Sequence, residues 1–168
     1  YAVVALGLNL QYGLMRIMNI SHGEFLMLGA YLTWVGFTVL QVNPLLFLPV
    51  VALALFALGV VVYWLCFHRI TRTAPAVEVI EARSLLVGFG LMFLVQNAAY
   101  LLWGADYRGY SFLAEPIEFG SARLMANRLT VFAFAVGASL ALLAVLRWTL
   151  IGKAVRAMMQ SPTGAQLV

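Results

Sequence analysis

The sequence predicts an all-α, polytopic transmembrane helix bundle, and three observations support this fold class. Of the 168 residues, 64% are hydrophobic and only 10% are charged, whereas soluble domains carry about 25% charged residues. The mean hydropathy is +0.99. The hydrophobic residues also form long unbroken runs, and about 20 helical residues suffice to cross the roughly 30 Å hydrocarbon core of a bilayer. Runs of this length exclude strands, so helices satisfy the backbone within the membrane.

We predict five spans in a single transmembrane domain. They cover roughly residues 1–18, 22–40, 45–67, 84–103 and 128–146, and residues 147–168 form a polar, basic tail. Asn43 and Pro44 are a turn signal that separates the second span from the third. The sequence begins without Met inside an apolar run, so we interpret it as a fragment that lacks the start of its first span.

The ten basic residues predict an orientation. Seven belong to one side of the membrane, namely Arg16, Arg69, Arg72, Arg83, Arg147, Lys153 and Arg156, and three to the other, namely Arg108, Arg123 and Arg128. The positive-inside rule then puts the loop after the third span, the tail and residues 19–24 at the cytoplasmic side. The long polar stretch of residues 104–127 lies outside. Because the basic residues form no single cluster interleaved with aromatic residues, a nucleic-acid partner is not supported.

A polar stretch between the first two spans, residues 19–25, needs an explanation because polar groups are costly in hydrocarbon. Ser21 and Glu24 have the spacing of a capping box, in which the Ser oxygen accepts from the backbone N–H of Glu24 and the Glu side chain returns to the Ser N–H. Alternatively, His22, Glu24 or Asn19 faces a substrate path. The two roles do not exclude each other, and for His22 and Asn19 a path and ordinary packing are equally supported.

Further path candidates come from helical spacing. Asn9, Tyr12, Arg16 and Asn19 lie three, four and three residues apart, which puts them on one face of a helix. A polar stripe on an apolar span should face the bundle interior or a wet cavity. Gln96 and Asn97 in the fourth span favour hydrogen bonds between helices over ligand binding. The substrate-path candidates are Asn9, Tyr12, Asn19, His22, Gln96 and Asn97.

We find no enzyme motif in this sequence. His22-Gly23-Glu24 has the H-x-E form of a zinc deaminase, but the partner P-C-x-x-C is absent from the sequence. The sequence also lacks H-E-x-x-H, G-x-S-x-G and a Walker A motif. We therefore predict no catalytic residue, no metal site and no cofactor in this chain, and ATP, if it is used, binds to another chain.

The tail predicts a short amphipathic helix over residues 152–160 that leaves the membrane. Gly152 allows the chain to turn and Pro162 ends the helix. Val155, Met158 and Met159 supply apolar contacts, while Lys153 and Arg156 stay in water. Such a helix is either an anchor at the membrane surface or a plug for a groove in a partner, and the residues by themselves favour the anchor.

Several stretches resemble the permease subunits of branched-chain amino acid ABC importers. They are residues 5–13 (ALGLNLQYG), 19–31 (NISHGEFLMLGAY), 84–90 (SLLVGFG) with Gln96-Asn97, 101–104 (LLWG), and 151–157 (IGKAVRA). The resemblance covers nearly the whole chain in order, and the second stretch is its most specific motif. The sequence departs from the family pattern at residues 161–164 (SPTG), where a charged residue is expected.

The resemblance implies a bacterial inner-membrane permease of about eight spans, with about three following Val168. Its implied partners are a second permease subunit, two ATPase subunits and an extracytoplasmic solute-binding protein. The tail then docks on an ATPase through Gly152, Lys153, Ala154, Arg156, Ala157 and Gln160. The implied function is inward transport of branched-chain amino acids by ATP-driven alternating access.

Other functions stay open. Importers of urea and short amides share these motifs, and an ion-coupled carrier or channel would belong to the same broad class. A carboxylate inside the membrane whose protonation drives transport would favour a carrier, and within the spans only Glu24 is available, which the capping box explains. A membrane anchor without transport would not need the polar stripe from Asn9 to Asn19.

Overall fold

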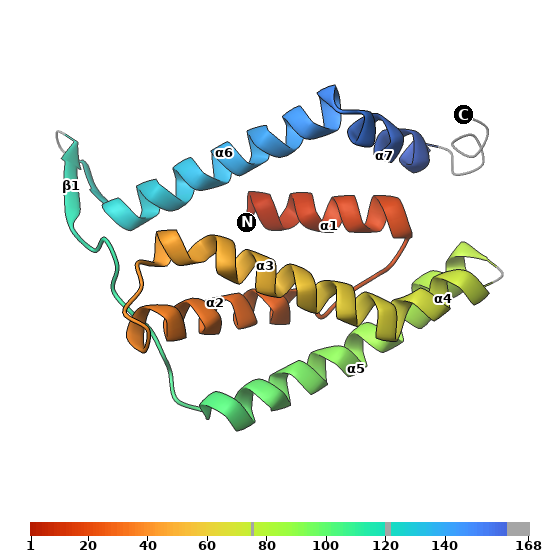
Figure 1. The fold of residues 1–168 in the computed structure, drawn as a ribbon, viewed down its shortest axis with the longest axis horizontal. Helices are drawn as coiled ribbons and strands as arrows, with labels where there is room; N and C mark the ends of the chain where they lie inside the picture. The colour runs from red at the N-terminus through yellow and green to blue at the C-terminus, as the bar shows by residue number, and fades with distance from the viewer. Residues whose placement is uncertain (75, 120–121, 161–168) are drawn as a thin grey trace. The chain divides into compact units, whose positions relative to one another are not determined.

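The computed structural model describes residues 1–74, 76–119 and 122–160 (Figure 1). Its elements are α1 (Ala2–Met15), α2 (His22–Thr38), α3 (Pro44–Val62), the π-helical turn η1 (Tyr63–Phe67), α4 (His68–Thr73), α5 (Val77–Trp103), β1 (Pro116–Phe119), β2 (Ala122–Met125), α6 (Ala126–Trp148) and α7 (Leu150–Gln160). The all-α fold class is confirmed, with one small hairpin added. The predicted helix stop at Pro162 and the departure at residues 161–164 lie outside the described residues.

Three helices in the described part of the chain are long and apolar enough to cross a membrane. They are Pro44–Thr73, α5 and α6, and α1 is a shorter apolar helix. This confirms the helical prediction for the third, fourth and fifth spans. Helix α2 has 17 residues, and the total of five spans stays a prediction.

Residues 68–83, where the sequence predicts a polar loop with a short helical piece, are mostly helical. Helix α3 continues through η1 and α4 to Thr73, and α5 begins at Val77, seven residues before the predicted span. Ala74 has an extended backbone, with φ −77° and ψ 130°, as a residue before proline prefers. Charged residues on both sides of this stretch, such as Arg72 and Glu78, are thus compatible with helix.

The chain divides into two compact units, which are described separately. One holds Arg16–Ser111, and in it α2 packs against α3 and α5. Asn43 caps α3 by accepting a hydrogen bond from the Leu45 N–H at 2.9 Å, and Pro44 takes the first helical turn, where its missing N–H costs least. Gly36 is buried in α2, and a Cβ at this position would collide with the ring of Phe47 in α3.

The other unit holds Tyr1–Met15 and Phe112–Val168, and in it α1 contacts α6 and α7. The hairpin pairs β1 with β2 in antiparallel register, with Ile117 opposite Leu124. The sequence predicted only a polar stretch here. Short strands without a long apolar run carry a weak signal, and the hairpin is found only through the pairing of its two halves.

Helices α6 and α7 meet at a tight corner. Thr149 Oγ1 accepts a hydrogen bond from the Gly152 N–H at 3.0 Å, so Thr149 acts as the N-cap of α7. Gly152 is buried, and a Cβ there would meet the Leu146 Cα at 2.5 Å and the Val145 carbonyl. The prediction that Gly152 serves a turn is therefore supported by a close backbone approach.

Candidate functional site

The site begins at a non-helical junction, residues 16–21, between α1 and α2. Helix α1 ends at Met15, and Arg16 has a φ of 54°, a left-handed conformation that few residues other than glycine adopt. The predicted four-residue stripe is therefore wrong in part. Asn9 and Tyr12 lie on α1, whereas Arg16 and Asn19 lie beyond its end and are not on a common helix face with them.

The junction lies directly against α5. Ser84 Oγ accepts a hydrogen bond from the Met18 N–H at 3.0 Å and donates one to the Glu81 carbonyl at 3.0 Å. One turn further along, a Cβ on Gly88 would be 3.1 Å from the Ile20 nitrogen. Non-helical backbone in a membrane protein is tolerated where protein buries it or water reaches it, and here Ser84 and Gly88 provide the burial.

Within the junction, Asn19 and Ser21 bond to each other. Asn19 Oδ1 accepts from the Ser21 N–H at 3.1 Å and from the Ser21 hydroxyl at 2.6 Å. Ser21 is fully buried and occupies the N-cap position of α2, but its side chain makes no capping hydrogen bond. The predicted capping box is therefore wrong, because the Ser21 hydroxyl already has Asn19 as its acceptor.

Glu24 also has a different partner from the predicted one. Gln96 Nε2, in α5, donates a hydrogen bond to Glu24 Oε1, in α2, at 2.8 Å. Gln96 thus forms a hydrogen bond between two helices, as the sequence predicted for this residue. Asn97 instead donates to the Phe93 carbonyl of its own helix at 2.7 Å.

The remaining path candidates are distributed over both units. Asn9 Nδ2 donates to the Ala5 carbonyl at 3.0 Å within α1, and Tyr12 is exposed on the same helix. His22 is half-buried at the start of α2. The structure gathers Asn19, Ser21, Glu24 and Gln96 around the contact between α2 and α5. That these side chains line a solute path stays a prediction.

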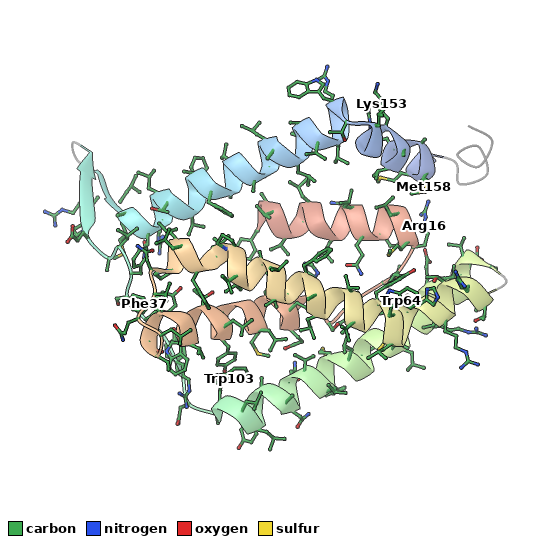
Figure 2. The ribbon with its side chains drawn as sticks, viewed as in Figure 1. Arg16, Phe37, Trp64, Trp103, Lys153 and Met158 are labelled. Carbon is green, nitrogen blue, oxygen red and sulfur yellow. The ribbon has the colours of Figure 1, made fainter. Side chains whose placement is uncertain are left out.

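Sequence reasoning missed a cavity at the other end of α2. Its volume is about 550 Å³, and Met27, Ala30, Tyr31 and Trp34 of α2 line it together with residues 105–110. The ring of Tyr31 stacks on Trp103 with centroids 4.7 Å apart, and Trp103 and Phe37 mark this end of the unit in Figure 2. Tyr31 and Trp34 are three residues apart, so the sequence predicts that they share a helix face. It does not predict which loop lies opposite that face.

The predicted docking residues lie on α7. Lys153, Ala154, Arg156 and Ala157 are exposed, Gly152 is buried at the corner with α6, and nothing is described of the Gln160 side chain. A Cβ on Gly13 of α1 would collide with the end of the Met159 side chain. Met159 therefore already has a partner within the chain, although Met158 and Met159 are both exposed on α7 together with its polar and Ala residues.

No group of three or more His, Cys, Asp or Glu side chains that could hold a metal ion occurs in the described residues. The potential ligands that are close in sequence, such as His22 and Glu24, belong to an apolar helix start. The arrangement can offer hydrogen bonds and charge to a solute.

Comparison with known proteins identifies the family of this chain. The family described as "Branched-chain amino acid transport system / permease component" matches residues 1–168. The high-affinity branched-chain amino acid transport system permease protein BraD of Pseudomonas aeruginosa is 31% identical over 103 residues, which are 60% of this chain and 34% of BraD. The match thus spans about a third of the length of that relative, and no solved structure matches significantly. The chain belongs to the family of permease components of branched-chain amino acid transport systems.

Proposed function

We propose that this chain is a permease subunit of an ABC importer in the bacterial cytoplasmic membrane. It carries branched-chain amino acids or a related small polar solute inward. A second permease subunit, two ATPase subunits and an extracytoplasmic binding protein complete the importer, and ATP is bound and hydrolysed by the ATPases. The observation that carries the proposal is the family match over residues 1–168.

The contacts between α2 and α5 support this function. Asn19, Ser21, Glu24, Ser84 and Gln96 concentrate hydrogen-bonding groups in a chain that is 64% hydrophobic. A structural anchor has no need of such groups within its apolar helices, because polar side chains there are costly. Transporters commonly offer non-helical backbone groups to a solute, and the junction of residues 16–21 between α1 and α2 is non-helical. ATP-driven rocking of α2 against α5 would alternately open and close this region.

The test is reconstitution of the full-length permease with its partner subunits in proteoliposomes. Uptake of radiolabelled L-leucine should require both ATP and the binding protein, and unlabelled isoleucine and valine should compete. Competition by urea or acetamide, with none by valine, would favour the short-amide importers instead. Absence of any transported solute under all conditions would favour a membrane anchor.

One observation favours an ion-coupled carrier as the second candidate. Glu24 accepts a hydrogen bond from Gln96 rather than closing a capping box, so capping no longer accounts for a carboxylate at this place. A carboxylate inside the membrane is a common proton-coupling group. If leucine uptake persisted without ATP and stopped on addition of a protonophore, the carrier would replace the importer.

A further inference from the structure

The cavity beside α2 combines aromatic walls with two opposite charges. All its lining residues belong to the unit Arg16–Ser111. Trp34 and Tyr31 lie on the α2 side, and Asp106 and Arg108 lie on the loop that follows α5. A volume of about 550 Å³ falls within the range of about 300–1,000 Å³ that is usual for small-molecule sites.

Arg108 is held in place by two contacts. Its Nε donates a hydrogen bond to the Trp103 carbonyl at 3.1 Å, and its guanidinium carbon lies 4.8 Å from the centre of the Trp34 ring. Trp103 in turn stacks on Tyr31. Because these contacts use Nε and the face of the guanidinium, the two terminal nitrogens keep their donors for another acceptor. A planar fork of this kind suits a carboxylate.

Asp106 lines the same cavity, but it does not neutralise Arg108. Within the described residues, the Asp106 carboxylate makes no hydrogen bond and no ion pair. Met27 and Ala30 supply an apolar wall next to these charges. One cavity therefore presents a cation and an anion, kept apart, together with an apolar surface.

We propose that this cavity binds an α-amino acid with an apolar side chain as a zwitterion. Arg108 binds its carboxylate, Asp106 binds its ammonium group, and Met27 and Ala30 contact its side chain. The assignment rests on the proposed function and names the place where the solute first meets the permease. The predicted orientation puts the loop of residues 104–127 outside, which is the side from which an imported solute arrives.

The experiment measures equilibrium binding of radiolabelled L-leucine to the full-length permease complex in nanodiscs, without the binding protein. Arg108→Gln and Asp106→Asn should each weaken leucine affinity by about 10- to 100-fold, since each removes a charged hydrogen-bond partner. The matched controls are Arg128→Gln and Glu115→Gln, which change the same charges at exposed positions outside the cavity. Both controls should bind leucine as the wild type does.

Two further measurements keep the outcome independent of folding. Arg108→Lys preserves the charge but loses the fork, so it should bind leucine more weakly than the wild type and more tightly than Arg108→Gln. With the wild-type complex, leucinamide, which lacks the carboxylate, and 4-methylpentanoate, which lacks the ammonium group, should both compete much more weakly than leucine.

Leucine affinities of Arg108→Gln and Asp106→Asn equal to those of the controls would overturn the proposal. If the wild type still imported leucine, the proposed function would survive that result. Unchanged leucine binding combined with loss of stimulation by the binding protein would also overturn it, and would mean that these charges contact that protein. A wild-type complex that neither bound nor imported leucine would end both the site and the proposed substrate.

Discussion

Ser84 Oγ accepts a hydrogen bond from the backbone N–H of Met18 at 3.0 Å, across 66 positions of sequence. The contact supplies an acceptor to a backbone N–H in the stretch where α1 has ended and α2 has not begun. Buried backbone groups without a partner are rare because they cost free energy. The interruption between the first two helices is therefore stabilised by a residue of α5.

Replacing Ser84 with Ala should lower the stability of the protein. The change removes the acceptor of the Met18 N–H at a fully buried position, with an expected cost of about 1–3 kcal/mol. Thermal unfolding of the full-length protein in detergent measures the loss. Ser139→Ala is the control, because the Ser139 hydroxyl donates only within its own helix, to the Ala135 carbonyl. Equal shifts for the two variants would contradict a special role of Ser84.

Gly88 and Gly90 of α5 are a matched pair for substitution with Ala, because only Gly88 lies close to other backbone. A Cβ on Gly88 would be 3.1 Å from the Ile20 nitrogen and 3.4 Å from the Met18 carbonyl oxygen, whereas a Cβ on Gly90 has nothing within 4 Å. Gly90→Ala should raise stability by up to about 1 kcal/mol because Ala favours helix. Gly88→Ala should lower the yield of folded protein, since backbone rather than a flexible side chain is in its way. The comparison is read from monodisperse protein in size-exclusion chromatography, and a stabilised Gly88→Ala would show that the junction does not pack on α5.

The contact between Glu24 and Gln96 separates structure from transport. Glu24→Gln keeps a carbonyl oxygen for Gln96 Nε2 and should retain near-normal folded yield and uptake. Glu24→Ala loses the acceptor, and we expect it to cost about 0.5–1.5 kcal/mol. Gln96→Ala should cost a similar amount, and the double variant should cost less than the sum. Normal yield without uptake in Glu24→Gln would instead make Glu24 a path or proton residue.

The seven-to-three distribution of basic residues predicts the topology. In a Cys66→Ala background, which removes the single cysteine of residues 1–168, a Cys at Thr73 should react with an impermeant maleimide only from the cytoplasmic side. A Cys at Ser111 should react only from the outside. Both positions are exposed, so absence of labelling cannot be ascribed to burial. Reaction of both from one side would refute the orientation.

Ala157→Arg tests whether α7 docks on an ATPase. Ala157 is exposed on α7, and its small side chain permits close approach of a partner, which Arg would block. We expect loss of co-purifying ATPase at unchanged permease yield, because the position lies outside the hydrocarbon. Ala114→Arg, at an exposed position of the predicted outer loop, is the control and should retain the ATPase. Retained ATPase with normal solute-stimulated hydrolysis in Ala157→Arg would leave α7 as a membrane-surface anchor.

The sequence by itself determined the fold class and the existence of the long apolar helices and of the helix in the tail, although the third and fourth helices extend beyond their predicted bounds. Hydrophobicity and turn residues act over a few neighbours, so Asn43 and Pro44 could be read directly as an element boundary. The end of α1 could not be predicted in this way. Residues 16–18 contain neither Gly nor Pro, and the apolar pattern continues to Met18, although the helix stops at Met15.

Only the tertiary structure decided the partners of the polar side chains. Ser21 and Glu24 fit a capping box by their spacing, but Asn19 and Gln96 take their hydrogen bonds, and Gln96 lies 72 residues from Glu24. Likewise, Arg108 and Asp106 share a cavity with α2 because the loop after α5 folds back on it. A hydrogen bond forms between the groups that the chain brings together in space, and the identity of the second group is not contained in the pattern around the first.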